Sequence, residues 1–442
     1  MTFGQFALLT RGDLVRSGLL TAALVGAALW VSFHFFEPAP PRRIVLASGT
    51  ESGLYHRHAQ RYREILTRDG VIVENRRTAG AAENLWLLLD PASGIDVAFL
   101  QGGVARFPEA DGLEMLSSLY YEPLWVFYRG SETRSELRGL AGQRIGVGIE
   151  GSGTRSFALA VLAMNGLLPT NTALVPVGGT DALGALKRGD LDAALFVGGA
   201  DSPVILDALR DPDVRLMSLD RAEAYTRRFS WLSKLTLPAG TVDFTVGIPA
   251  QDVQLIGTKA MLAARDGLHP ALINLLTDAA LEIHGKQGYF EAAGEFPGMA
   301  HVDLRVSPEA ERHRRFGPNV LHRYLPFWVA TLVTRAVILV LPLVVVLIPL
   351  FRYLPEFFRW RIRSRIYRWY GELSLLERDV ASRQGTLPVE QWLQDIDRIE
   401  RAVAAIRTPA SFASEAYTLR EHVGLVRRAV LAKAAGQGAP SG

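Results

Sequence analysis

The chain has 442 residues, 49% of them hydrophobic, with a formal net charge of +3 and no cysteine. This length allows two or three domains with large cores, and so small a charge does not indicate a nucleic-acid partner. The absence of cysteine excludes disulfides, thiol nucleophiles and cysteine-bound metals, and it leaves the redox compartment open.

The first distinctive segment is an apolar run near the N-terminus. Residues 18–36 carry no charge, and Arg11 and Arg16 precede them. No small-x-small cleavage site follows, because the chain continues with a proline-rich linker. We therefore predict an uncleaved transmembrane signal anchor at 18–36 behind a cytoplasmic N-terminus at 1–17. A cleaved signal peptide is the alternative.

The region after this anchor contains an internal repeat. The run from Arg43 to Gly53 is echoed by residues 144–153, and the run from Ile95 to Gly103 is echoed by residues 191–199. Each copy indicates a strand, a Gly/Ser turn, a helix, and a second buried strand that begins after an Asp. The repeat predicts two similar α/β lobes whose glycine turns face each other across a cleft.

The predicted elements of these lobes alternate between strands and helices, which indicates a parallel or mixed sheet in each lobe. Lobe 1 is assigned to residues 42–130 and 241–320, and lobe 2 to residues 131–240. The expected strands are Arg43–Ala47, Val71–Arg77, Asp96–Leu100, Leu119–Tyr128, Arg144–Val147, Leu174–Val177 and Asp192–Val197. The segment Asp243–Ile256 is expected to return to the first lobe. The expected helices are Tyr55–Asp69, Glu83–Leu89, Thr154–Asn165, Asp181–Arg188 and Pro270–His284.

A second apolar run, residues 327–351, is long enough to cross a membrane with some tilt. Basic residues precede the first run and follow the second, which predicts that both termini are cytoplasmic and that the lobes are extracytoplasmic. Residues 352–442 would form a cytoplasmic helical tail with two amphipathic helices, which pack on each other or on a partner. The basic aromatic stretch at 357–370 fits either a helix on membrane lipid or a simple positive-inside flank.

Three Gly/Ser turns are the candidate ligand-binding features. They cover residues 49–53, 78–84 and 151–154, each between a predicted strand and a predicted helix. A helix that starts there presents unpaired N–H groups to an approaching carboxylate or phosphate. Each turn alone is better explained as a tight structural connection, but three together favour a ligand site at the carboxyl edge of the sheets.

The sequence gives little indication of dinucleotide binding or of catalysis. Gly146 to Gly151 fits the dinucleotide pattern G-x-G-x-x-G, yet no acid occurs between Gly151 and Thr180 to bind a ribose. Ser152 lacks the G-x-S-x-G context of a hydrolase nucleophile. We therefore expect no catalytic residue, no metal and no cofactor, and an enzyme that uses Ser152 is the least favoured reading.

Taken in order, the motifs resemble the TAXI family of solute-binding proteins, which serve TRAP transporters. The resemblance covers residues 43–249. The motifs are Gly49-Thr50-Glu51-Ser52-Gly53-Leu54-Tyr55, Thr78-Ala79-Gly80-Ala81-Ala82-Glu83-Asn84, Asp96-Val97-Ala98-Phe99-Leu100-Gln101, Gly148-Ile149-Glu150-Gly151-Ser152-Gly153-Thr154 and Pro238-Ala239-Gly240-Thr241.

The resemblance implies a two-lobed fold of the periplasmic-binding-protein type II class that closes on a small acidic solute, such as glutamate, glutamine or a dicarboxylate. It also implies a TRAP-type membrane permease as partner. Together with the glycine turns, it gives as ligand-binding residues Gly49, Thr50, Ser52, Gly53, Tyr55, Thr78, Asn84, Gln101, Gly151, Ser152, Gly153 and Thr154. The chain departs from the family pattern at Ser52, His56 and Ala81.

The membrane run and the tail also depart from the soluble receptors of this family. They leave a second hypothesis open, in which a ligand-sensing or structural membrane receptor relays lobe closure to the cytoplasmic helices. A permease that copurifies with the protein would favour the transport reading. A signalling protein bound to the tail would favour the second.

Overall fold

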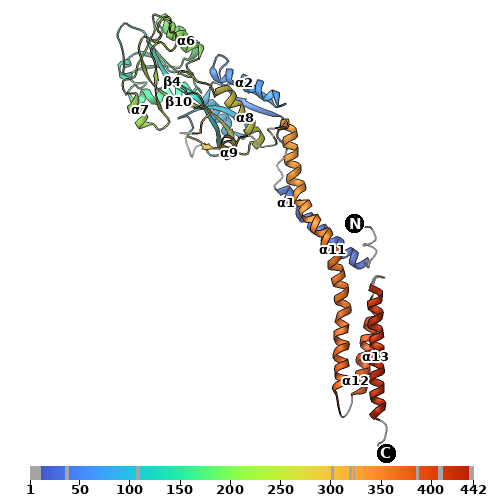
Figure 1. Ribbon diagram of the computed structural model, residues 1–442. Helices are drawn as coiled ribbons and strands as arrows, with labels where there is room; N and C mark the ends of the chain where they lie inside the picture. Colours follow the sequence, from blue (N-terminus) through green and yellow to red (C-terminus); the bar gives the residue numbers. More distant parts are fainter. Residues whose placement is uncertain are drawn as a thin grey trace, which may run out of the picture. The chain divides into compact units, whose positions relative to one another are not determined.

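The computed structural model describes residues 11–34, 39–105, 110–299, 303–317, 321, 324–384, 388–406 and 412–437. The chain divides into two compact units. We call Pro38–Leu332 the lobed domain, and we call Met1–Glu37 together with Val333–Gly442 the helical unit. Figure 1 labels α6 and α7 on one side of the lobed domain and α2, α8 and α9 on the other.

The first lobe is built on a mixed sheet with helices on both faces. Its three parallel strands have the order β2 (Ile72–Arg76), β1 (Arg43–Ala47), β3 (Val97–Gln101). Next come β10 (Val253–Arg265), which is antiparallel to β3, and β4 (Leu113–Tyr128), which is antiparallel to β10. Apolar residues of α2 (Leu54–Arg68) and α8 (Pro270–His284) share one core with the sheet, and those of α3 (Ala81–Leu89) share another.

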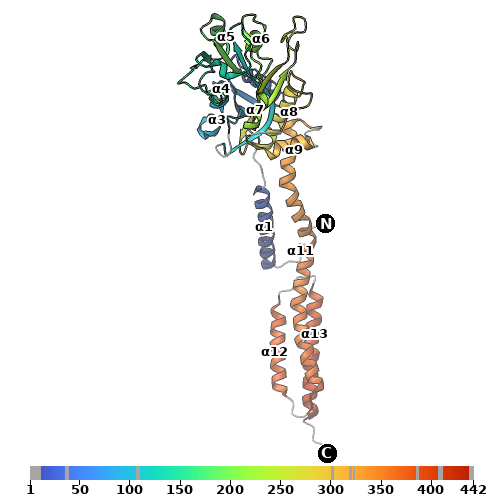
Figure 2. The ribbon, with the colours of Figure 1, turned by 90° about the vertical axis from the view of Figure 1, so that its left-hand side faces the viewer.

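The second lobe repeats this plan. Its parallel strands have the order β6 (Ala173–Val175), β5 (Arg144–Gly146), β7 (Ala193–Val197), and antiparallel β4 completes the sheet. Residues of α4 (Gly153–Met164) and α7 (Ala222–Arg228) share one core, and those of α5 (Gly179–Arg188) and α6 (Pro203–Arg210) share the other. Figure 2 shows α5 and α6 at one end of the lobed domain and α9 at the other. The α/β class predicted from the repeat is therefore confirmed.

Two aspartates explain why the repeat begins its second strand with an acid. Asp96 accepts a hydrogen bond from the Val45 backbone N–H at 2.8 Å, and Asp192 accepts one from the Arg144 backbone N–H at 2.8 Å. Each carboxylate thus ties the start of one parallel strand to its neighbour. An aspartate therefore connects equivalent parallel strands in both lobes.

The predicted return segment at Asp243–Ile256 is a strand only in its last part. Residues 243–248 form a turn, in which Asp243 accepts hydrogen bonds from the backbone N–H groups of Thr245 and Val246, and the strand β10 begins only at Val253. The Asp side chain competes with sheet hydrogen bonds for these N–H groups, which favours a turn. The elements that were not expected are α6, α7, β8 (Arg215–Leu216), β9 (Ser233–Leu237), β11 (Arg305–Val306), α9 (Pro308–Phe316) and the short 3₁₀ turns Pro91–Ser93 and Leu137–Leu140.

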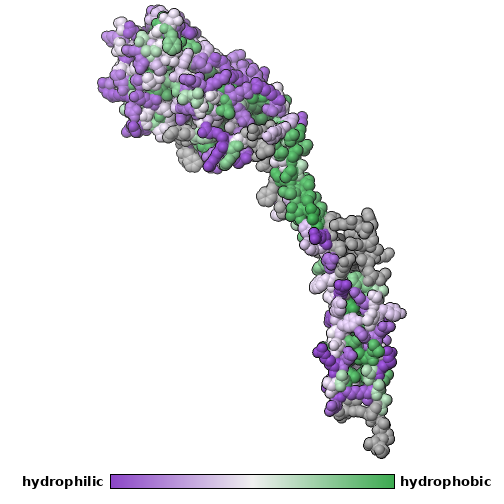
Figure 3. Space-filling view, in the orientation of Figure 1, coloured by the Kyte–Doolittle hydropathy of each residue, from purple (hydrophilic) through white to green (hydrophobic). Residues whose placement is uncertain are grey.

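The second predicted membrane segment is the start of a much longer helix, α11 (Phe327–Ser382). Among the residues searched, Phe327–Pro349 is the one stretch long and apolar enough to cross a membrane, and Figure 3 shows its apolar surface. The first predicted anchor coincides with α1 (Arg11–His34). Residues 35 and 36 and many side chains of α1 lie outside the described part, so the first span stays a prediction.

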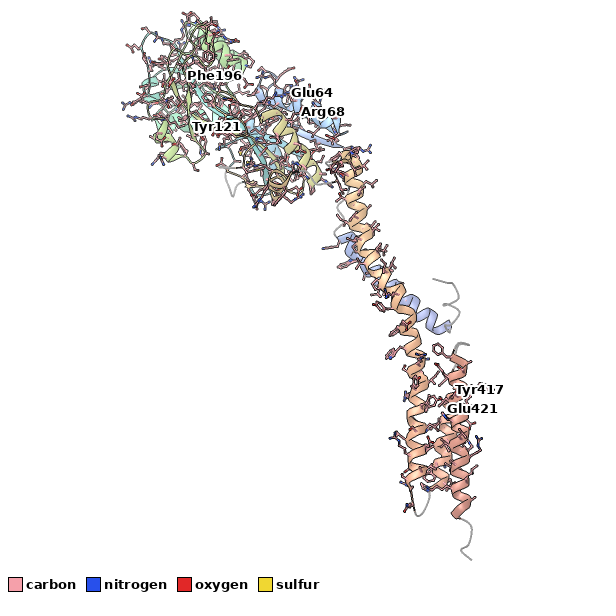
Figure 4. All side chains as sticks on the ribbon, in the orientation of Figure 1. Glu64, Arg68, Tyr121, Phe196, Tyr417 and Glu421 are labelled. Atoms are coloured by element: carbon pink, nitrogen blue, oxygen red, sulfur yellow. The ribbon has the colours of Figure 1, made fainter. Side chains whose placement is uncertain are left out.

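The tail folds as a bundle of three helices. The end of α11, α12 (Val389–Ala405) and α13 (Ala413–Gln437) bury one apolar seam, to which α11 contributes Ile366, Leu373 and Val380. Trp392 Nε1 also donates to Asp379 Oδ2 at 2.8 Å. Figure 4 labels Tyr417 and Glu421 on α13, and Tyr417 is largely exposed. The two amphipathic helices of the tail therefore pack on each other and on α11.

Candidate binding cleft

A cavity of about 550 Å³ lies within the lobed domain, and both lobes contribute to its wall. It lies at the carboxyl ends of the parallel strands, where open α/β sheets bind ligands. The predicted site residues that line it are Gly49, Thr50, Ser52, Gly53, Tyr55, Gln101, Ser152, Gly153 and Thr154. The three lobe-1 and lobe-2 turns are thus brought together as the repeat predicts.

Five helices begin at the cavity wall. Their N-cap residues, which all line the cavity, are Gly53, Gly80, Ser152, Gly178 and Ser202. Four of these caps have no side-chain hydrogen bond to the helix, and only Ser152 accepts one, from the Arg155 N–H. The unpaired N–H groups and the positive dipole end of a helix N-terminus favour a negatively charged group, and five such ends lie at this wall.

Gln101 is a buried side chain with hydrogen-bonding capacity to spare. It is only 3% exposed, it lines the cavity, and its Nε2 has no hydrogen-bond partner among the described residues. Gly153 of the other lobe makes room for it, because a β-carbon there would overlap the Gln101 amide oxygen. An unpaired buried amide is costly, so a ligand acceptor at this position would be stabilising.

Glu122 is a site residue that the sequence pattern did not reveal. It is 4% exposed on β4 and lines the cavity, and Tyr55 Oη donates to its Oε2 at 2.9 Å and to the Leu100 carbonyl at 3.3 Å. Burial raises the pKa of Glu122 to about 8, because the apolar surroundings disfavour the charged form. Figure 4 labels Tyr121, the preceding residue of β4, and Phe196 of β7, which also lines the cavity.

Three predicted site residues lie outside the cavity wall. Asn84 is fully buried and donates to the carbonyls of Ser48 and Phe99 at 2.6 and 2.8 Å, while its Oδ1 accepts from the Thr78 hydroxyl at 2.6 Å. Thr78 and Asn84 therefore hold the ends of β1 and β3 together. The Gly151 carbonyl accepts from the Glu83 N–H at 3.0 Å, so Gly151 joins the two lobes.

The lobes touch on either side of the cavity. Besides the contact at Gly151, Arg57 Nη2 donates to the Asp201 carbonyl at 3.3 Å, and Gly80 lies close to Ser152.

The charged residues that line the cavity are Arg57, Glu51, Glu122 and Asp181. Glu51 and Asp181 are exposed, and Glu51 pairs with Arg77 at 2.7 Å. Glu122 is thus the buried acid of this wall.

Some lining residues gave little signal in the sequence. The turns at Gly178 and Ser202 follow β6 and β7, and only the strand–helix alternation could have indicated them. For Glu122 a signal was present, since it is the one acid in the apolar aromatic run Leu119–Tyr128. A lone acid in a buried strand is either paired or functional.

The comparisons with known proteins concern the lobed domain. The NMT1-like family model matches residues 46–295. Among solved structures, the chain is similar to a protein from Bordetella bronchiseptica RB50 at 18% identity, over 55% of this chain and 70% of that one, with a TM-score of 0.39. It is similar to the periplasmic aliphatic sulphonate binding protein SsuA from Escherichia coli at 15% identity, over 55% and 69% of the chains, with a TM-score of 0.36. An ancestral arginine-binding protein bound to arginine matches at 13% identity over 55% and 92%, also with a TM-score of 0.36.

Proposed function

Because this chain belongs to the NMT1-like family, we propose that it is a membrane-anchored solute-binding receptor of the TRAP-transporter type, which captures a small acidic solute between its lobes. One observation carries the proposal. Five helix N-termini line a single cavity of about 550 Å³, a volume suited to a small molecule. Their unpaired N–H groups would hold a carboxylate of the solute.

Further support comes from Gln101 and Gly153. Gln101 brings a free amide donor from lobe 1, and Gly153 begins α4 in lobe 2. A solute that binds both the Gln101 amide and the N-terminus of α4 would contact both lobes at once, so that binding favours the closed arrangement. The order of the five motifs supports the TAXI subtype, with a separate TRAP-type permease as the protein that receives the solute.

The proposed location is the cytoplasmic membrane, with two spans, the lobed domain outside and both termini inside. The apolar stretch Phe327–Pro349 and the basic residues after it support this topology. Since the chain has no native cysteine, single cysteines report accessibility cleanly. Ser131→Cys and Ser414→Cys, both at exposed positions, form a matched pair. In intact cells, an impermeant maleimide should label the first and spare the second; the reverse pattern would refute the topology.

The test of binding is calorimetric titration of the full chain, solubilised in detergent, with dicarboxylates, amino acids and 2-oxo acids. We expect at least one acid to bind with one-to-one stoichiometry. The same acid, at about 100 times its dissociation constant, should stabilise the lobed domain by about 2.7 kcal/mol. A folded protein that binds no acid from this panel would refute the proposed function. Copurification of a permease would separately support the TRAP-type partner.

A second candidate function is a receptor that relays ligand binding to the tail. The observation that favours it is the continuity of α11, since Phe327 packs in the core of the first lobe and Leu373 packs in the core of the tail bundle. Comparing hydrogen exchange in α12 and α13 with and without solute tests it. A solute-dependent change in exchange favours the relay, and unchanged exchange favours transport alone.

A further inference from the structure

The buried carboxyl of Glu122 has an unusual environment for an acid at a cavity wall. Its partner on α2 is the Tyr55 hydroxyl, and no Lys, Arg or His among the described residues lies within ion-pair distance of it. Burial of an acid without a cation costs free energy unless the acid is protonated or a cation arrives from elsewhere. At this wall, a solute can bring such a cation.

The other titratable groups near Glu122 cannot supply that charge. Tyr55 and Tyr120 remain neutral in the physiological range, because burial raises the pKa of both phenols well above their ordinary value. Arg57 lines the same cavity and keeps its charge, but it forms no ion pair with Glu122; one of its amino groups donates to the Asp201 carbonyl at 3.3 Å. The strand opposite Glu122 places Thr258 beside it, which carries no charge.

The cavity therefore presents two opposite chemistries. Backbone N–H groups at five helix starts favour a negative group, and the Glu122 carboxyl together with the Tyr55 oxygen favours a positive group or a hydrogen-bond donor. A simple dicarboxylate would satisfy the first and leave Glu122 without a counter-charge. A zwitterion would satisfy both.

We propose that Glu122 is the specificity-determining residue of the cleft and binds the ammonium group of an amino-acid solute, whose carboxylate binds at the helix N-termini. This inference rests on the proposed function, of which it names the solute class. When the ammonium arrives, Glu122 releases its proton to solvent and becomes the carboxylate partner of the cation. Binding of an amino acid is thus linked to loss of one proton.

The linkage gives a pH dependence with a defined sign. In the free protein the pKa of Glu122 is about 8, so at lower pH most molecules hold the neutral acid. Affinity for an amino acid should rise as pH rises toward that value, by about 50-fold between pH 6 and pH 8. A 2-oxo acid, which has no ammonium, should instead bind the protonated form and lose affinity above about pH 8.

The experiment titrates the full chain in detergent with matched pairs of probes, each an amino acid and the 2-oxo acid with the same side chain. Glutamate with 2-oxoglutarate, alanine with pyruvate, and leucine with 4-methyl-2-oxopentanoate make a suitable set. Each probe is measured from about pH 6 to pH 8.5 against the wild type and Glu122→Gln. Because glutamine imitates the neutral acid of the free protein, this variant should keep the fold, and an unchanged unfolding transition checks that it does.

In the wild type, one amino acid should bind more tightly than its 2-oxo partner, and affinity should rise with pH. In Glu122→Gln, that amino acid should lose about 10- to 100-fold in affinity, the rise with pH should vanish, and the 2-oxo acid should bind as before. Glu291→Gln is the matched control. Burial also raises the pKa of Glu291, which accepts from the Tyr121 N–H at 3.0 Å, but Glu291 is not among the residues that line the cavity.

The outcomes separate this inference from the function on which it rests. If acids bind but the ammonium gives no advantage and Glu122→Gln changes nothing, Glu122 is a structural acid and the inference is overturned while the binding function stands. An equal loss in Glu291→Gln would also overturn it, because the effect would not be specific to the cavity. If no acid binds, the proposed function itself fails.

Discussion

The two lobes share one topology but contribute different chemistry to the cavity. Lobe 1 offers the side chains of Gln101, Tyr55 and Glu122 together with helix N-termini at Gly53 and Gly80, while lobe 2 offers helix N-termini at Ser152, Gly178 and Ser202. The strand β3 of lobe 1 ends in Gln101 and the strand β7 of lobe 2 ends in Val197, and two glycines follow each of them. A repeat can therefore keep its scaffold while the side chains that its two copies present to the cavity diverge.

The largest expected effect concerns Asn84 of lobe 1. Asn84→Ala should destabilise lobe 1, because it leaves the Ser48 and Phe99 carbonyls and the Thr78 hydroxyl without their buried partner. We expect a loss of about 3 to 5 kcal/mol. Hydrogen exchange at β1 and β3 should rise accordingly. The control in lobe 2 is Asn165→Ala, whose side chain is only partly buried and bonds to Tyr225 and Val161. Equal losses in both would mean that Asn84 has no special role.

The next largest effect should come from adding a β-carbon at Gly153, where the two lobes are in contact. A β-carbon at Gly153 would overlap the Gln101 amide and lie 3.1 Å from Ala81 Cβ of the other lobe. Gly153→Ala should therefore weaken solute binding by about 10- to 100-fold, since overpacking costs about 1 to 3 kcal/mol. Gly139→Ala, where nothing lies within 4 Å of the added atom, is the control for calorimetry. Unchanged affinity in Gly153→Ala would show that the solute binds with the lobes apart.

The sequence predicted the scaffold better than the site, and Asn84 and Glu122 show why. Strand–helix alternation and the repeat depend on local pattern, so they indicated both lobes and the glycine turns. Asn84 belongs to a turn that reads as ligand-binding, yet its amide is turned inward to two carbonyls brought together only by the fold. Glu122 reads as part of a core strand, and its role depends on β4 leaving one sheet for the other at Pro123 and Leu124.

A smaller effect should distinguish the Gln101 side chain, as a hydrogen-bond donor to the solute, from the N-terminus of α4 at Ser152. Gln101→Ala should reduce solute affinity by about 10-fold, because its Nε2 has no hydrogen-bond partner within the described structure and is free to bind solute. Ser152→Ala should leave affinity nearly unchanged, since its hydroxyl already donates to the Ile149 carbonyl at 2.6 Å and accepts from the Arg155 N–H. It should cost about 1 kcal/mol of stability as a lost helix cap. A larger affinity loss in Ser152→Ala than in Gln101→Ala would reverse the roles of the lobes.

The smallest effect concerns the aspartates that the two lobes share. Hydrogen bonds from the Arg144 side chain lower the pKa of Asp192, so its stabilising contribution is present above the unfolded value of about 3.9 and is lost as pH falls through the lower folded value. The Asp192 side chain is 38% exposed, so solvent screening keeps this contribution below about 1 kcal/mol. Hydrogen exchange at β5 between about pH 3 and pH 5 should show the loss in the wild type and not in Asp192→Asn. If β5 of Asp192→Asn kept the same acid sensitivity, the bond from Asp192 to Arg144 would not be its source. In that case Asp192 would connect β7 to β5 without making the stability of this region depend on pH.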